Sequence, residues 1–174
     1  MMLHIGKKAI VPLVIILLSG SLNTAHAQRL VFLFAHGVYS IPNGSSFKNA
    51  YNFGAGGEAG IGVGLLGKTF ITGTIGFTDF VHSSANPNGN LTYVPIKVGI
   101  RHYLFARILY IHGDIGAGNT KQNKIDYSAT KVAGDLGVGV KLAAFELQAD
   151  YEGLIGNNPS GSWFALKAGF NFGL

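Results

Sequence analysis

Cysteine is absent from this 174-residue chain, and charged residues are scarce, at 12% of the total. The absence of cysteine excludes a disulfide framework, a thiolate metal site and a cysteine nucleophile. Soluble domains carry about 25% charged residues, so the low value favours a protein that shows little charge to its surroundings. Long hydrophobic runs are also missing. The apolar stretch Ala9–Leu18 is only half of the roughly 20 residues that a membrane-spanning helix needs.

The first 27 residues have the pattern of a secretory signal peptide. Lys7 and Lys8 form a positively charged flank before the short apolar segment, and Ala25-His26-Ala27 places small residues where a signal peptidase reads them. We therefore predict a cleaved signal peptide at residues 1–27 and one domain at residues 28–174.

The net charge is small. The loss of Lys7 and Lys8 with the signal peptide lowers the formal charge from +5 to +3. Ordinary lysines in surface loops account for a charge of this size, so the sequence predicts no nucleic-acid partner.

Residues from Leu91 to Leu104 alternate between two chemically different sets. One set is mostly aliphatic, with Val94, Ile96 and Val98, whereas the other carries Lys97 and Arg101. Alternation of residue type with a period of two residues, sustained over more than ten residues, predicts a long strand with two unlike faces. We predict eight such strands, near Leu30–Tyr39, Phe53–Leu65, Thr69–Phe80, Leu91–Leu104, Ile108–Asn119, Thr130–Leu142, Phe145–Leu154 and Ser162–Leu174. Each is close to the roughly 9–11 residues of a tilted strand that crosses a membrane.

The connections between these strands alternate in length. The short ones are Leu66-Gly67-Lys68, Phe105-Ala106-Arg107 and Ala143-Ala144. The long, polar ones are Ser40–Asn52, Val81–Asn90, Thr120–Ala129 and Ile155–Gly161. Tight turns at one end and long loops at the other are typical of an outer-membrane barrel with both termini at the short-turn side.

The polar faces of the predicted strands are rich in glycine and in charges of both signs. Glycine weakens a strand on a solvated face, but inside a narrow eight-stranded barrel it leaves space for longer side chains. We therefore predict that the polar faces point inward and form an ion-pair network in a barrel too narrow for an open pore. The network residues are Glu58, Lys97, Arg101, Asp114, Lys131, Asp135, Lys141, Glu146, Asp150, Glu152 and Lys167.

The apolar faces are predicted to contact lipid, at positions such as Val98, Ile100, Val138, Val140 and Leu166. The first strand is apolar on both sides, so its orientation is left open. An aromatic girdle at the membrane boundaries is expected from residues near the strand ends. Its members would be Tyr93, Tyr103, Tyr110, Tyr151 and Trp163.

These features resemble the small eight-stranded outer-membrane β-barrel superfamily, with its OmpA/OmpX-type and opacity-type members. The stretch Tyr93–Arg101 is similar to the polar-in, aliphatic-out strands of that group, and the ending Phe170–Leu174 resembles the terminal strand that barrel-assembly machinery reads. The resemblance covers nearly the whole mature chain. It implies an all-β, eight-stranded antiparallel up-and-down transmembrane β-barrel of the cell outer membrane, a monomer in contact with outer-membrane lipid and lipopolysaccharide.

One cluster invites a catalytic hypothesis. His82 and Ser84 match the first two positions of the His-x-Ser-Asn stretch of PagL-type lipid A deacylases, whereas Asn86 lies one residue late. A polar loop rich in turn residues explains the same segment, so we predict that the protein is not an enzyme.

The histidines that remain after signal removal are His36, His82, His102 and His112, and no two show a metal-ligand spacing. The sequence therefore predicts neither a metal site nor a cofactor. It favours a structural or surface-interaction protein of the outer membrane without an open pore. The alternatives are a lipid A-modifying barrel enzyme and a soluble exported ligand-binding barrel.

Overall fold

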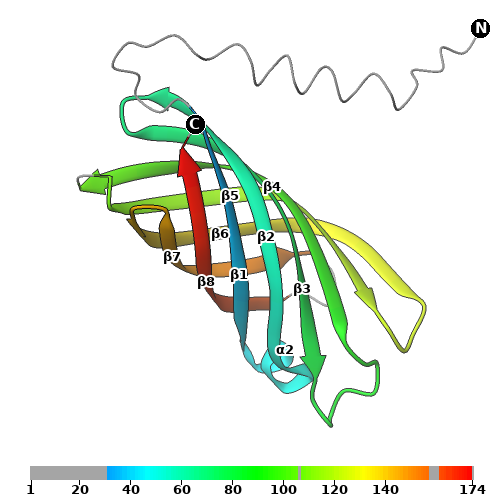
Figure 1. Cartoon of the computed structure of the whole chain (residues 1–174). Helices are drawn as coiled ribbons and strands as arrows, with labels where there is room; N and C mark the ends of the chain where they lie inside the picture. The colour runs from blue at the N-terminus through cyan, green and yellow to red at the C-terminus, as the bar shows by residue number, and fades with distance from the viewer. Residues whose placement is uncertain (1–30, 106, 157–160, 174) are drawn as a thin grey trace, which may run out of the picture.

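The computed structural model describes residues 31–105, 107–156 and 161–173, so the predicted signal peptide lies outside the described residues. The strands are β1 (Val31–Asn43), β2 (Tyr51–Leu66), β3 (Thr69–His82), β4 (Leu91–Phe105), β5 (Leu109–Gln122), β6 (Tyr127–Leu142), β7 (Phe145–Ile155) and β8 (Gly161–Gly173), with helix α2 (Ser45–Ala50) between β1 and β2. Each strand is antiparallel to the next, and β8 pairs with β1 to close the barrel (Figure 1). The predicted all-β, eight-stranded up-and-down barrel is confirmed.

The short and long connections lie at opposite ends of the barrel. β1 begins and β8 ends at the end that holds the short turns, because Phe32 pairs with Gly173 there. Several strands run further toward the long-loop end than the sequence predicted, since β1 extends to Asn43 and β5 to Gln122. Helix α2 was not predicted. It lies in the connection between β1 and β2, and its one buried side chain is Phe47.

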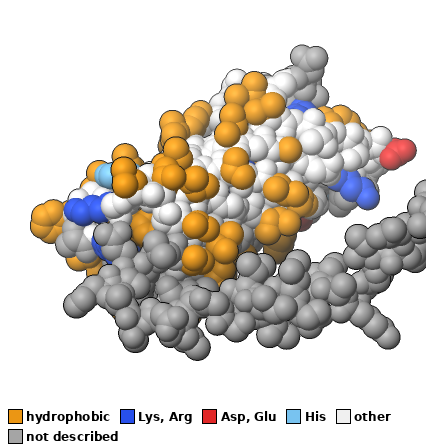
Figure 2. Space-filling view, turned by 90° about the horizontal axis from the view of Figure 1, so that it is seen from above, with side chains coloured by type: hydrophobic (Ala, Val, Ile, Leu, Met, Phe, Trp, Pro, Cys, Tyr) orange, Lys and Arg blue, Asp and Glu red, His pale blue; other side chains and the backbone are white. Residues whose placement is uncertain are grey.

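Alternate residues of each strand face outward and inward. Most outward residues are apolar and exposed, as with Val98 at 61%, whereas the neighbouring Lys97 is only 3% exposed. The structure also orients β1, which places Phe34, His36 and Val38 inside. Figure 2 shows hydrophobic side chains spread over the visible outer face, with charged side chains toward its ends.

The outward face identifies the medium around the barrel. Every strand carries exposed apolar side chains, among them Ile100, Val138, Val140 and Leu166. An apolar surface of this extent is far larger than the patches of about 300–600 Å² on soluble monomers. A soluble barrel would instead bury its apolar face, so this surface argues against the soluble alternative and is the surface expected of a barrel in a lipid bilayer.

Among residues 31–105, 107–156 and 161–173, no helix has the length and apolar character to cross a membrane.

The predicted aromatic girdle is wrong for four of its five members. Tyr151 points outward, but Tyr93, Tyr103, Tyr110 and Trp163 are buried inside the barrel. The reason is the period of two. Tyr93 and Tyr103 are separated from Lys97 and Arg101 on β4 by even numbers of residues, so they have the same parity, that is, the same place in the two-residue alternation. They therefore point inward with these charged residues, despite their positions near the strand ends.

Replacing an outward residue with arginine tests the lipid-facing band. We expect Val138→Arg to lower the free energy of unfolding by about 2–4 kcal/mol, since the charge would lie in the apolar part of the bilayer. Val138→Ile, which keeps the site apolar, serves as the control. Equilibrium unfolding in lipid vesicles measures both variants, and an arginine variant as stable as the isoleucine variant would show that Val138 does not face lipid.

Candidate functional site

The interior at the long-loop end is filled by a group of rings that we call the long-loop aromatic cluster: Phe47, Tyr51, Phe80, Tyr93 and Trp163. Trp163 of β8 is fully buried at its centre. Its ring centroid lies 5.0 Å from Phe80 and 5.1 Å from Tyr93. Helix α2 lays Phe47 over the same indole at 5.6 Å. This end of the barrel is therefore closed by packed rings.

A second group, the turn-end aromatic cluster, fills the other end: Phe32, Phe34, Phe70, Tyr103 and Tyr110. The Arg101 guanidinium lies against it, 4.3 Å from the Tyr110 ring centroid and 5.0 Å from that of Phe32. Cation–π contacts of this kind stabilise a buried guanidinium.

Glycine makes room for these rings on the inner wall. A Cβ atom at Gly139 would lie 2.0 Å from Cζ of Tyr110, and one at Gly62 would lie 2.2 Å from Cζ of Phe32. No side chain fits at either position while the ring stays in place. The glycines on the inward faces thus have the spatial role that the sequence predicted.

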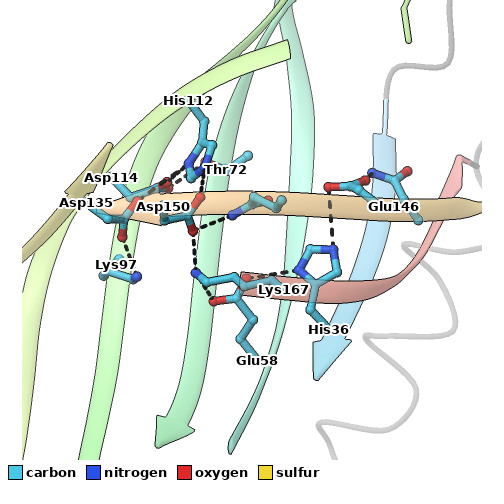
Figure 3. A network of polar contacts seen from close by, with 12 residues as sticks. His36, Glu58, Thr72, Lys97, His112, Asp114, Asp135, Glu146, Asp150 and Lys167 are labelled. Carbon is cyan, nitrogen blue, oxygen red and sulfur yellow. Dashed lines mark hydrogen bonds and ion pairs between the residues drawn. The ribbon is translucent and has the colours of Figure 1, made fainter. Parts of the chain in front are cut away.

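Between the two aromatic clusters lies a band of charged residues, drawn in Figure 3. At its centre is Lys167, whose Nζ lies 2.8 Å from Glu58 Oε2, 2.8 Å from Asp150 Oδ2 and 2.7 Å from Glu152 Oε1. Lys97 contacts Asp135 directly and lies 3.9 Å from Glu152. One lysine therefore holds three carboxylates in a space that solvent barely reaches.

A second part of the network lies beside the turn-end aromatic cluster. Arg101 Nη1 is 2.9 Å from Glu146 Oε1. Lys141 donates to Asn171 Oδ1 at 2.7 Å, and the amide of Asn171 donates to Glu146 Oε2 at 2.6 Å. Tyr110 also donates its hydroxyl proton to Glu146. Lys131 is buried on β6 toward the long-loop end.

Two network members were missed at the sequence level. His112 Nδ1 lies 2.7 Å from Asp114 Oδ2, and its Nε2 lies 2.9 Å from Asp150 Oδ1. His36 Nδ1 lies 3.0 Å from Glu58 Oε1. His112 lies two residues from Asp114 on β5 and so shares its inward face, which was a usable signal in the sequence.

The charged band leaves almost no free space. The cavity among Lys97, His112, Asp135 and Lys167 has a volume of about 10 Å³. A single water needs about 10–15 Å³ by the same measure. Side chains therefore fill the barrel at three successive levels, two aromatic and one charged.

The two residues of the catalytic hypothesis lie outside this band. His82 is the last residue of β3, and its ring bonds to Asn90 Oδ1 at 2.7 Å. Ser84 is exposed in the turn that follows. Within the described part of the chain, the hydrogen-bond partner of the His82 ring is thus an amide and not the Ser84 hydroxyl.

Removing the central cation tests the network. We expect Lys167→Met to lower the free energy of unfolding by about 3–5 kcal/mol, because Glu58, Asp150 and Glu152 lose their shared partner while they stay buried. Lys121→Met, at an exposed site, is the matched control and should change stability by less than about 0.5 kcal/mol. Urea unfolding in detergent gives both values. Equal stability of the two variants would mean that the buried contacts contribute nothing.

No family model matches the sequence, and no curated protein matches it. Solved structures do match. The Yersinia pestis attachment invasion locus protein Ail has a TM-score of 0.55 at 16% identity, with 82% of this chain and 96% of Ail covered. Neisserial surface protein A has a TM-score of 0.57 at 13% identity, with 83% and 97% covered. Ail in complex with the heparin analogue sucrose octasulfate has a TM-score of 0.53 at 17% identity, with 82% and 96% covered. The chain therefore has the fold of the small eight-stranded outer-membrane β-barrels.

Proposed function

We propose that the protein is a structural or surface-interaction barrel of a Gram-negative outer membrane, without an open pore. The observation that carries this proposal is the filled interior. Two aromatic clusters close the ends, and the charged band between them leaves a cavity of about 10 Å³. Pores that pass solutes need wider barrels, with about 16–18 strands in porins. Any role that involves other molecules then belongs to the outer surface and the loops.

The proposal includes how the protein reaches the outer membrane and its oligomeric state in that membrane. A cleaved signal peptide at residues 1–27 would direct export, and barrel-assembly machinery would insert the chain as a monomer. The sequence pattern of residues 1–27 supports the first step. The completed pairing of β1 with β8 supports a self-sufficient monomer, because it leaves no strand edge open to a partner.

We also propose that the long-loop end contacts the anionic groups of lipopolysaccharide. Lys48 on α2, Lys121 near the end of β5 and Lys124 in the following loop are exposed there. Of the eight acids, all of which the structure describes, only Asp126 is exposed. The excess of positive charge at this end favours phosphate groups at the bilayer surface.

The absence of a pore is tested by planar-bilayer recordings of the purified protein. We expect no stable ohmic conductance, because side chains block the interior at three levels. The bare detergent buffer and a known porin in the same bilayers give the two reference traces. A large and steady conductance from this protein would contradict the proposal.

The lipopolysaccharide contact is tested with the triple variant Lys48→Ser, Lys121→Ser, Lys124→Ser. Each lysine near an anionic surface contributes about 1 kcal/mol, so we expect the variant to bind lipopolysaccharide micelles markedly less tightly than wild type. Lys68→Ser removes an exposed lysine at the short-turn end and should leave binding unchanged. The contact is disproved if the triple variant and the Lys68 variant bind alike.

The enzyme alternative is tested through Ser84. A serine nucleophile needs a base within hydrogen-bond reach, and the His82 ring bonds to Asn90 instead. We therefore expect cells that express wild type and cells that express Ser84→Ala to have the same lipid A mass spectrum. Loss of an acyl chain with wild type alone would identify the protein as a deacylase.

A further inference from the structure

We propose that His112, Asp135 and Asp150 form a binding site for one divalent transition-metal ion, such as Zn²⁺, inside the barrel. This proposal is independent of the function proposed above. The three residues come from the neighbouring strands β5, β6 and β7 and converge in the charged band (Figure 3). One donor atom from each lies within 4.8 Å of the other two. An imidazole nitrogen and carboxylate oxygens are ligands that Zn²⁺ takes in proteins.

Each of the two aspartates has one oxygen beside a lysine and the other beside the His112 ring. Lys97 contacts Oδ2 of Asp135, and Lys167 holds Oδ2 of Asp150 at 2.8 Å. The Oδ1 atoms are turned toward His112, at 2.9 Å from its Nε2 for Asp150 and at 3.5 Å from its Nδ1 for Asp135. Oδ1 of Asp135 is buried without a hydrogen-bond partner. A buried carboxylate oxygen left without a partner is costly, and a cation at the site would satisfy it.

A glycine provides the space in which the donors meet. Gly137 of β6 pairs with His112 on one side and with Asp150 on the other. A Cβ atom on Gly137 would lie 2.0 Å from Asp150 Oδ1 and 2.6 Å from His112 Nε2. The missing side chain therefore lets these two donor atoms approach each other over the inner wall of the barrel, 2.9 Å apart.

The surroundings of His112 match those of a metal-binding histidine. Metal-bound histidines almost always donate the other ring N–H to a carboxylate or a carbonyl. Here Nδ1 faces Asp114 Oδ2 at 2.7 Å. The other oxygen of Asp114 accepts a hydrogen bond from the Thr72 hydroxyl at 2.9 Å. This arrangement fixes the ring and leaves Nε2 directed toward the Asp150 oxygen.

The local charges also favour a bound cation. Lys97 and Lys167 contact four carboxylates, those of Glu58, Asp135, Asp150 and Glu152, and Asp114 brings a fifth to His112. Negative charge therefore exceeds the charge of the two lysines around the site. The competing state has a proton on His112 Nε2 in place of the metal. Because aromatic clusters close both ends of the barrel, the ion would enter while the barrel folds and would exchange slowly afterwards.

Refolding the purified full chain with Co²⁺ or Zn²⁺ tests the site. The protein is unfolded in chelator, refolded in detergent with the metal, passed over a desalting column and checked for folding by its heat-modifiable gel mobility. We expect one retained ion per folded chain, with a visible Co²⁺ spectrum of nitrogen and oxygen coordination. A folded wild type that retains no Co²⁺ and no Zn²⁺ would overturn the proposal and would favour a protonated His112 in place of a bound metal.

Variants assign the ligands. We expect Asp135→Asn and His112→Gln to lose the retained ion, and Asp114→Asn to weaken binding about 10–100-fold, as for other residues that orient a ligand. His36→Gln is the matched control, since it removes the other interior histidine beside two carboxylates. Equal loss in the His36 variant, or full retention in the His112 variant, would overturn the assignment. If a ligand variant does not fold, metal retention by the wild type and its Co²⁺ spectrum still decide whether the barrel binds a metal ion.

Discussion

The pairing of β8 with β1 is the constraint on which the rest of the structure depends. In lipid no water is present to satisfy backbone N–H and C=O groups, so a sheet can cross a membrane only when it closes. Closure with eight strands fixes a narrow interior. Every inward side chain must then fit a confined space, and every inward charge must find a partner there. The two aromatic clusters, the wall glycines and the charged band are three results of that one requirement.

The charged band is the part of this arrangement that least tolerates the loss of a side chain. Lys167 contacts three carboxylates within 2.8 Å, and His112 lies between Asp114 and Asp150. Buried charges stabilise a structure only when geometry and hydrogen bonds offset their loss of hydration. The aromatic clusters on either side keep water out, which strengthens each contact and also raises the cost of any missing partner. The unpartnered oxygen of Asp135 stands out against this background.

The sequence predicted the parts of the fold that depend on parity alone. The alternation of Lys97 with Val98 assigned each to its face, and the short connections placed the turns. Parity would also have placed Tyr93 and Trp163 inside, but their positions near strand ends were given more weight, which produced the wrong girdle. Helix α2 has no periodic signal over its six residues. The grouping of His112 with Asp135 and Asp150 depends on strand register, which sets which residues of three strands lie side by side, and no pattern within one strand encodes it.

The central claim is that parity separates a lipid-facing surface from a filled interior. Nuclear Overhauser contacts between lipid acyl chains and side-chain methyl groups, measured in bilayer nanodiscs, test it without altering the protein. The account predicts contacts from the acyl chains to Ile100, Val138 and Leu166, which are exposed, and none to Val38, Leu91 and Leu154, which are buried inside. Acyl-chain contacts to Val38, Leu91 and Leu154, or to both sets equally, would contradict it.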